Sequence, residues 1–483
     1  MRFVPRGLAA VRARGPSAAR AVTSAAAATL SRLHDIAAAD EPNARVAGTG
    51  GSLTVPRPRQ EPGVLDDVND ARQYRRVPRA GKPRSLALGP RKGHMTGAEL
   101  PPDELRRAAQ SALWTFPAIL LSSFVVAWGA ECAQFYISQG LALALLAWIQ
   151  VLPEFAVEAV IAWHQNVPLM TANFTGALRL LTGLGWPMIW LVSAFARRSR
   201  GEPNFWRPVE LDHEHAVEVV GLTPALFYFG WIVWKGSLGL WDAAVLMLIY
   251  AGYLFVLRRI PPREQEEIED TGAVPRAVLA LPTPWRPIGV VALFLVGGVI
   301  LYFTAHPFLK SMVGLATVAG VSQFVFVQWV APFLSEFPEF TTTSYWARSR
   351  GKAGMALMNM ASSNINQWTV LAAMIPVVYS WSLGHAASVP LWAHRIEVLL
   401  TLLQGALGVV LLANFEFQAY EALGLLLFWG VQFVVPGSRV VMCWAYGGWL
   451  AFELLSASWR PGRLRAFAVF PALWRGHGGP VAR

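Results

Sequence analysis

The chain has 483 residues, of which 54% are hydrophobic and only 15% are charged, and its mean hydropathy is positive at +0.39. Soluble domains carry about 25% charged residues, so this composition excludes an ordinary soluble globular protein. The net charge of +11 does not indicate nucleic-acid binding, because the arginines lie in an N-terminal segment and in loops between apolar runs, where membrane topology explains most of them. The two cysteines, Cys132 and Cys443, lie in or beside apolar runs and cannot form a disulfide framework.

Residues 1–108 contain no segment that could cross a bilayer, and they are rich in Arg, Ala, Pro and Gly. This composition predicts a disordered N-terminal extension. A transit peptide is an alternative, because the first acidic residue is Asp35. A third interpretation places the start of translation at Met95, which would leave 94 residues untranslated.

Apolar runs of about twenty residues, the length that crosses a bilayer, recur through the rest of the chain and predict an all-α polytopic membrane protein. The expected spans are 112–130, 138–163, 168–196, 215–234, 238–257, 286–304, 311–346 (broken by its prolines), 355–381, 394–413, 418–435 and 438–456. A cytoplasmic loop at 259–285 separates two halves, 109–258 and 286–436. An extra span and a basic tail occupy 437–483.

Two hairpins of one kind lie far apart in this chain. Pro153-Glu154-Phe155 matches Pro338-Glu339-Phe340, and an asparagine follows each, Asn173 after twenty positions and Asn359 after twenty-one. Similarity extends to whole halves, since Trp241-Asp242-Ala243 resembles Tyr420-Glu421-Ala422. An odd number of spans per half predicts an inverted repeat, with the hairpins meeting near the membrane midplane.

Arginine-rich loops follow the third, fifth, seventh and eleventh predicted spans, which all lie on one side. The positive-inside rule places that side in the cytoplasm and the N-terminus outside. We therefore expect an integral multi-pass protein of the plasma membrane of a prokaryote, whose partners are the lipid bilayer and inorganic cations. Neither a protein partner nor a cofactor is indicated.

Carboxylates within apolar runs are costly and usually face a cavity or a partner. Glu154 and Glu339 are expected to bind a cation together. Glu158 and Glu336 lie one turn from them on the same helix faces. Further candidate ligands are Asn173, Asn359, Ser363 and Asn364. Oxygen donors without sulfur or imidazole suit hard cations such as Ca²⁺. The alternatives are structural buried acids and amides that join helices through hydrogen bonds.

Arg179 lies about ten residues into the third predicted span. A charge at this depth requires compensation, and the nearest candidates are Glu154 and Glu158 on the preceding span. We expect Arg179 to form an ion pair with one of them and to modulate the cation site. The alternative is an arginine that extends its guanidinium to the membrane surface.

The paired hairpins resemble the alpha repeats of the sodium/calcium exchanger family, within the cation/Ca²⁺ antiporter group, over about residues 110–436. There each repeat runs roughly G-(S/T)-S-x-P-E, a loop, then G-N-x-x-G-S-N-I. The first hairpin keeps Pro153, Glu154, Asn173 and Gly176, and the second keeps Ser335, Pro338, Glu339, Thr343, Asn359, Ser363, Asn364 and Ile365. The resemblance implies a ten-span antiporter core in which the two repeat glutamates coordinate transported ions.

This chain departs from that pattern mainly in the first hairpin. Gln150 and Val151 replace hydroxyl residues, and Ala177-Leu178 followed by Arg179 replaces the serine and asparagine. Glu158 and Glu336 are additional carboxylates at positions where the family has small or hydroxyl residues. Ion identity and stoichiometry therefore do not follow from the resemblance.

The main functional prediction is secondary antiport of Ca²⁺ or a related cation against Na⁺ or H⁺, without enzymatic activity and without any metal beyond the transported ion. Coupling to protons is an alternative within transport. An alternative from another class is a non-transporting membrane scaffold or sensor with a degenerate ion site. A phosphate-binding loop is not present in the sequence, which disfavours an ATP-driven pump.

Overall fold

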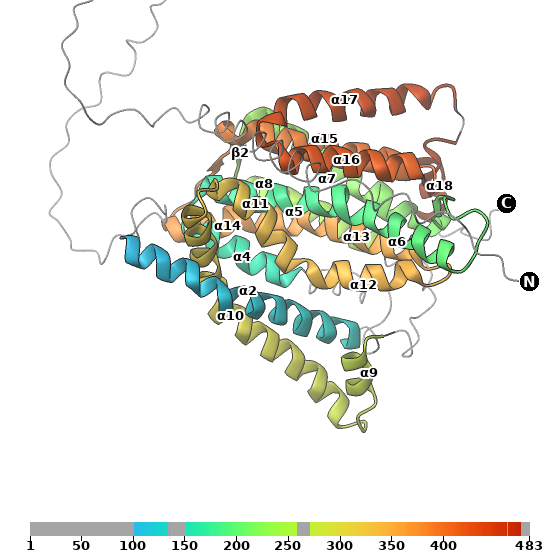
Figure 1. Cartoon of the computed structure of the whole chain (residues 1–483). Coiled ribbons are helices and arrows are strands. Elements are labelled where there is room, and N and C mark those ends of the chain that lie inside the picture. The colour runs from blue at the N-terminus through green and yellow to red at the C-terminus, as the bar shows by residue number, and fades with distance from the viewer. Residues whose placement is uncertain (1–100, 134, 136–150, 258–270, 461, 475–483) are drawn as a thin grey trace, which may run out of the picture. The chain divides into compact units, whose positions relative to one another are not determined.

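Helices form nearly all of the chain that the computed structural model describes, which comprises residues 101–133, 135, 151–257, 271–460 and 462–474 (Figure 1). Six helical stretches are long and apolar enough to cross a membrane: Pro102–Ala133, Val167–Ser199, His213–Lys235, Leu240–Leu257, Trp285–Val318 and Trp392–Leu412. Several shorter apolar helices accompany them, including Gln323–Ser335 and Ala419–Val434. The prediction of an all-α polytopic membrane protein is confirmed.

The first half of the chain begins with α2 and contains one π-helical turn. Its elements are α2 (Pro102–Ala133), α4 (Leu152–Trp163), α5 (Val167–Leu180), the π-turn Leu181–Gly185, α6 (Trp186–Ser199), β1 (Val209–Glu210), the 3₁₀ turn His213–His215, α7 (Ala216–Lys235), β2 (Ser237–Leu238) and α8 (Leu240–Leu257). Helix α9 (Ala273–Leu279) follows within the segment that we predicted as a loop.

The second half repeats this order, including the π-turn. Its elements are α10 (Trp285–Val318), α11 (Gln323–Ser335), α12 (Phe337–Arg348), α13 (Ala353–Asn366), the π-turn Gln367–Leu371, α14 (Ala372–Leu383), β3 (Val389–Pro390), the 3₁₀ turn Trp392–His394, α15 (Arg395–Leu412), β4 (Glu416–Phe417) and α16 (Ala419–Val434). The 3₁₀ turn Pro436–Ser438, α17 (Arg439–Ser456) and α18 (Arg465–Trp474) complete the described part.

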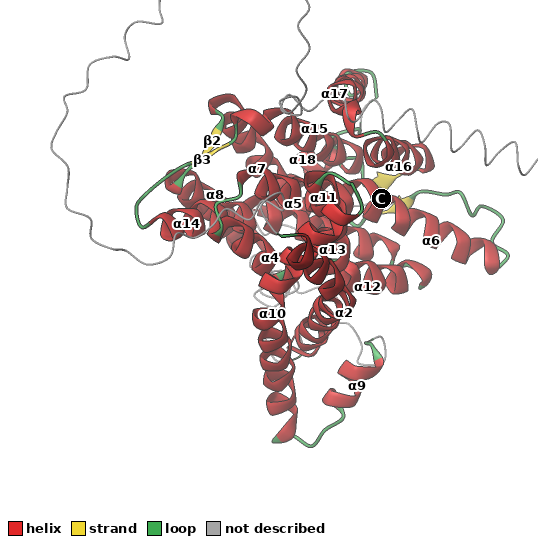
Figure 2. Cartoon of the chain, turned by 60° about the vertical axis from the view of Figure 1, so that its left-hand side comes forward, coloured by secondary structure: helices red, strands yellow, loops and turns green. Residues whose placement is uncertain are grey.

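Two short sheets show how the halves are related. Strand β1 precedes α7 and pairs with β4, which follows α15, whereas β2 follows α7 and pairs with β3, which precedes α15. Figure 2 shows the sheets as two separate yellow patches. The start of α7 therefore lies beside the end of α15, so these corresponding helices run antiparallel, as inverted repeats require. The count of five spans per half stays a prediction, because residues 136–150 are outside the described ranges.

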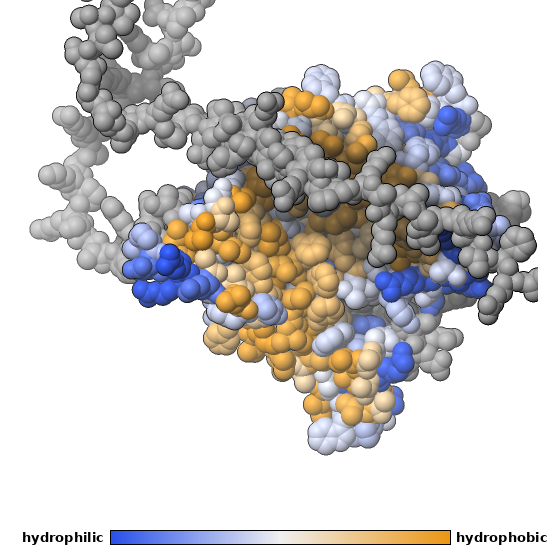
Figure 3. Space-filling view, viewed as in Figure 1, coloured by the Kyte–Doolittle hydropathy of each residue, from blue (hydrophilic) through white to orange (hydrophobic). Residues whose placement is uncertain are grey.

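Burial differs strongly between the helices that carry the hairpins and those that surround them. In the most apolar 18-residue window of Val167–Ser199, 72% of the window is buried. The corresponding share in Trp285–Val318 is only 28%. Helix α10 exposes large apolar side chains, among them Trp285, Leu295 and Phe303. The face that carries α2 and α10 is largely orange in Figure 3, as expected for side chains in contact with lipid.

Several predicted boundaries are wrong. The sixth span does not end near residue 304, because α10 continues to Val318 through Pro307. In lipid a helix satisfies its backbone internally, and a proline inside it is tolerated. The turn lies instead at 319–322, where Gly320 has φ +66°, a conformation that favours glycine. Residues 102–108 are the first turns of α2 and not part of a disordered extension, and the tail contains α18. The predictions for residues 1–100 lie outside the described residues.

Candidate cation site

Both Pro-Glu motifs begin a helix. Pro153 lies in the first turn of α4 and Pro338 in the first turn of α12, where a missing N–H costs nothing and the fixed φ suits a helix. Glu154 and Glu339 therefore occupy first turns, where the helix dipole favours negative charge. Glu336 lies at the break between α11 and α12. The local sequence thus places two buried carboxylates, Glu154 and Glu339, at the starts of α4 and α12.

Gln367, which begins the second π-turn, joins the two hairpins. Its Nε2 donates to Glu154 Oε2 and to Glu336 Oε1, each at 2.8 Å. Glu154 also lies close enough to Glu339 for their charges to repel, although 185 positions separate them. Gln367 was not among the predicted site residues. The only signal was its place at the end of the polar run SSNINQ.

The other predicted residues surround the carboxylates. Asn173 Nδ2 donates to Glu158 Oε2 at 2.6 Å, and Ser363 Oγ donates to Glu339 Oε1 at 3.0 Å. Asn364 instead donates to Thr182 Oγ1 at 3.3 Å, a residue that sequence reasoning missed. Asn359 lies one turn before Ser363 and is only partly buried. Its amide nitrogen is buried without a hydrogen-bond partner among the described residues.

All four carboxylates are nearly inaccessible, with relative exposures of 1% for Glu154, 0% for Glu158, 3% for Glu336 and 5% for Glu339. In each, one oxygen accepts a hydrogen bond and the other has no partner among the described residues. The side-chain oxygens of Asn364 and Gln367 are buried and equally unpartnered. Such atoms are costly to bury unless something pairs with them. The cluster therefore has the donor set of a hard cation.

The carboxylates do not converge on one point in this structure. Within the described ranges, no three His, Cys, Asp or Glu side chains are arranged to hold a metal ion together. The Gln367 amide N–H group lies between Glu154 and Glu336 and donates a hydrogen bond to each of them.

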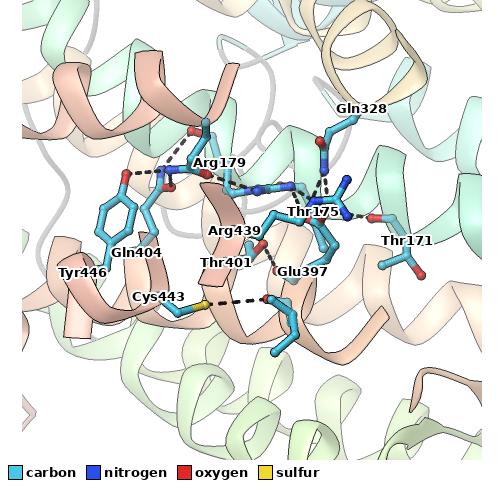
Figure 4. A network of polar contacts seen from close by, with 12 residues as sticks. Thr171, Thr175, Arg179, Gln328, Glu397, Thr401, Gln404, Arg439, Cys443 and Tyr446 are labelled. Atoms are coloured by element: carbon cyan, nitrogen blue, oxygen red, sulfur yellow. Dashed lines mark hydrogen bonds and ion pairs between the residues drawn. The ribbon is translucent and has the colours of Figure 1, made fainter. Parts of the chain in front are cut away.

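Arg179 belongs to a separate buried network (Figure 4). Its Nη2 lies 2.8 Å from Glu397 Oε2, and its Nη1 donates to Gln432 Oε1 at 3.1 Å. The predicted ion pair with Glu154 or Glu158 is therefore wrong. Asn173, which contacts Glu158, lies six residues earlier on α5. Six residues turn a helix by roughly 240°, so Arg179 lies on another face of α5 and points toward α15 and α16.

The Arg179 network extends to the extra span. Arg439, at the start of α17, forms an ion pair with Glu397 Oε1. Gln328 of α11 donates to Glu397 Oε2 at 3.4 Å, and Gln404 of α15 donates to the Arg179 carbonyl at 3.0 Å. This network ties α5, α11, α15, α16 and α17 together. The partners of Arg179 were missed because ionisable and amide residues in different spans show no local pattern that pairs them.

Comparison with known proteins places the chain in a family. Residues 108–258 and 289–436 match the family described as "Sodium/calcium exchanger protein". The crystal structure of the H⁺/Ca²⁺ exchanger CAX is 31% identical with a TM-score of 0.69, and the likeness covers 76% of this chain and 91% of CAX. A structure of the sodium-calcium exchanger NCX_Mj, soaked with Na⁺ and Sr²⁺, is 17% identical with a TM-score of 0.44, covering 68% of this chain and 99% of that one. No curated protein matches the chain.

Each matched segment contains one of the two Pro-Glu hairpins, and together they span more than half of the chain. The helices that are long and apolar enough to cross a membrane agree with this match, and together they indicate an integral membrane protein. A family match of this extent, with 31% identity to a solved exchanger over three quarters of the chain, establishes that the chain belongs to the sodium/calcium exchanger protein family.

Proposed function

We propose that this protein is a secondary antiporter that carries Ca²⁺ or a related divalent cation across a membrane in exchange for protons. The proposal rests on one observation: two hairpins bring four buried glutamates together, and each keeps one carboxylate oxygen without a partner. Within the described part of the chain, no arginine, lysine or histidine lies within ion-pair distance of Glu154, Glu158, Glu336 or Glu339.

Charge balance determines what the site requires. Four ionised carboxylates in a buried cluster would repel one another and lose their hydration, at a cost of several kcal/mol for each ion. Mobile cations or protons must therefore neutralise them. A divalent cation balances two carboxylates, and protons on the same oxygens balance them when the cation leaves. The likeness to CAX, described as an H⁺/Ca²⁺ exchanger, supports protons as the exchanged ion.

Gln367 gives the site a way to change state. In the present arrangement its amide N–H group bridges Glu154 and Glu336. Rotation of the side chain would free both carboxylates and would present the Gln367 Oε1 acceptor to the cation instead. We propose that Asn173 and Ser363, which already contact Glu158 and Glu339, orient the carboxylates. Asn359 and Asn364 would supply further oxygen ligands.

Reconstituted vesicles test the proposal. The full chain should accumulate ⁴⁵Ca²⁺ when a pH gradient is imposed, and Glu339→Gln should abolish uptake while the protein remains folded in the membrane. Glu416→Gln, which changes an exposed glutamate of β4, serves as the matched control and should transport normally. Uptake driven by a Na⁺ gradient but not by a pH gradient would refute proton coupling. Normal uptake by Glu339→Gln would refute the site.

We propose a structural role for Arg179. Because its partner is Glu397 and not a site carboxylate, it should hold α5 against α11 and α15 as a fixed ion pair. It would then modulate the cation site only through the position of Asn173 on α5. The transported charge per cycle would not include it.

A further inference from the structure

A polar cavity of about 510 Å³ lies at one end of the molecule, away from the carboxylate cluster. Its walls are the end of α6, the loop to β1, and the turn between α12 and α13, which the arginine-rich loops place at the predicted cytoplasmic side. Figure 2 shows the loop after α6 in green, at the right of the molecule. This volume is within the range that accommodates small ligands.

Charged side chains gather in the lining of this cavity. They are four arginines, Arg197, Arg200, Arg207 and Arg350, and three carboxylates, Glu202, Glu210 and Asp212. Arg197 is only 5% exposed and donates to the carbonyls of Arg207 and Pro208. Its Nε is buried without a hydrogen-bond partner among the described residues.

The Glu202 carboxylate already occupies two of the cavity arginines, Arg200 and Arg207. Its Oε1 lies 2.9 Å from Arg200 Nε, and its Oε2 lies 3.4 Å from Arg207 Nη2. Hydrogen bonding from Arg200 is the main cause that lowers the pKa of Glu202, and the charges of Arg200, Arg207 and Arg350 add to it. Three arginine side chains therefore act on this one carboxylate. Arg350 is exposed and forms no ion pair within the described ranges.

We propose that this cavity binds a phosphate group, carried by an anionic lipid headgroup or by a free phosphate compound. Arginine is the residue best suited to phosphate, because its planar guanidinium donates several hydrogen bonds in a fixed geometry. Glu202 is then an internal competitor that holds Arg200 and Arg207 when the phosphate is absent. Anionic lipids of the cytoplasmic leaflet supply such groups at the predicted cytoplasmic side.

A bound phosphate would connect the two halves of the chain. Arg200 Nη1 already donates to the Arg348 carbonyl at 2.8 Å, which joins α6 to the α12–α13 turn. Helix α13 also packs closely against β1, since a Cβ at Gly354 would lie 2.5 Å from the Glu210 carbonyl oxygen. A phosphate held by Arg207 and Arg350 would reinforce this junction, from which α12 leads back toward Glu339.

Binding to the purified full-length protein tests the proposal without relying on transport. Pyrophosphate is titrated by calorimetry in a detergent without phosphate. Arg350→Gln and Arg207→Gln should each weaken binding by roughly tenfold, the loss of one charge-assisted hydrogen bond. Glu202→Gln should tighten it, because the competitor loses its charge. Arg198→Gln is the matched control, since Arg198 follows Arg197 but stacks on Phe205 outside the cavity lining.

A second arm distinguishes the source of the phosphate. The thermal midpoint of the protein is compared in bilayers of phosphatidylcholine alone and in bilayers that also contain phosphatidylglycerol. If pyrophosphate does not bind but phosphatidylglycerol stabilises the wild type and not Arg350→Gln, the proposal holds with a lipid as the ligand. It is overturned if neither ligand acts, or if Arg198→Gln weakens binding as much as Arg350→Gln.

Discussion

The Arg179–Glu397 pair allows a quantitative test of the buried network. Both side chains are almost fully buried, with relative exposures of 2% and 3%. Breaking a buried ion pair from one side typically costs about 3–5 kcal/mol, because the remaining charge is left uncompensated. The loss of stability in Arg179→Leu should lie at the lower end of this range, since Arg439 still contacts Glu397. The loss in Glu397→Leu should lie at the upper end, since Arg179 then keeps only neutral hydrogen-bond partners.

The double variant separates this explanation from a simple loss of packing. Replacing both charges with leucine removes the desolvation cost of two ions, which is often neutral for stability or favourable. Gln432 would lose the donor Arg179 and Gln328 would lose the acceptor Glu397, at about 1 kcal/mol apiece. The double variant should therefore be less destabilised than the sum of the single variants by about 3 kcal/mol.

Unfolding by a denaturing detergent in mixed micelles, followed by circular dichroism, measures these free energies. Arg198→Leu, an exposed arginine of α6, controls for the loss of a charge alone. Calcium uptake by Arg179→Leu should keep the ion and pH dependence of the wild type, because Arg179 has no site carboxylate as its partner. Additive single effects, or a changed pH dependence without a loss of stability, would show that this account of Arg179 is wrong.

Three further predictions concern the packing, the site and the cavity. Gly176→Ala should prevent normal folding, because the alanine Cβ would lie 1.9 Å from the Gln328 carbonyl oxygen. Size-exclusion chromatography of a fluorescent fusion measures this, and a monodisperse peak from the variant would contradict the prediction. Gln367→Leu should lower the apparent Ca²⁺ affinity, measured by ⁴⁵Ca²⁺ binding, whereas unchanged affinity would exclude Gln367 as a ligand. The pKa of Glu202 is lower in the folded protein than in the unfolded chain. Ionised Glu202 therefore stabilises the fold above its unfolded-state pKa, and this stabilisation is lost as the pH falls through the folded-state pKa. Trp206 fluorescence should therefore change in that acidic window in the wild type and not in Glu202→Gln.

Two site features could be predicted from sequence patterns, one from repetition and one from helical periodicity. A single Pro-Glu pair has little meaning, but the same pair with an asparagine about twenty residues later, in two distant hairpins, predicted that Glu154 and Glu339 would approach each other. In the structure Gln367 donates hydrogen bonds to Glu154 and to Glu336, which lies three residues before Glu339. Helical periodicity also placed Glu158 and Glu336 beside them. Gln367 was not predicted as a site residue because the bridge that it forms depends on how the start of the second π-turn packs against α4.

Sequence alone determined the membrane class, the helical fold and the bounds of most spans, since apolar length and the need to satisfy the backbone in lipid are local properties. Only the tertiary structure decided the partner of Arg179. An ionisable residue can be assigned to a span from sequence, but its direction depends on the rotation of the helix and on which neighbour packs against that side. Glu397 lies 218 positions away, and it reaches Arg179 because the two halves fold together with α15 beside α5.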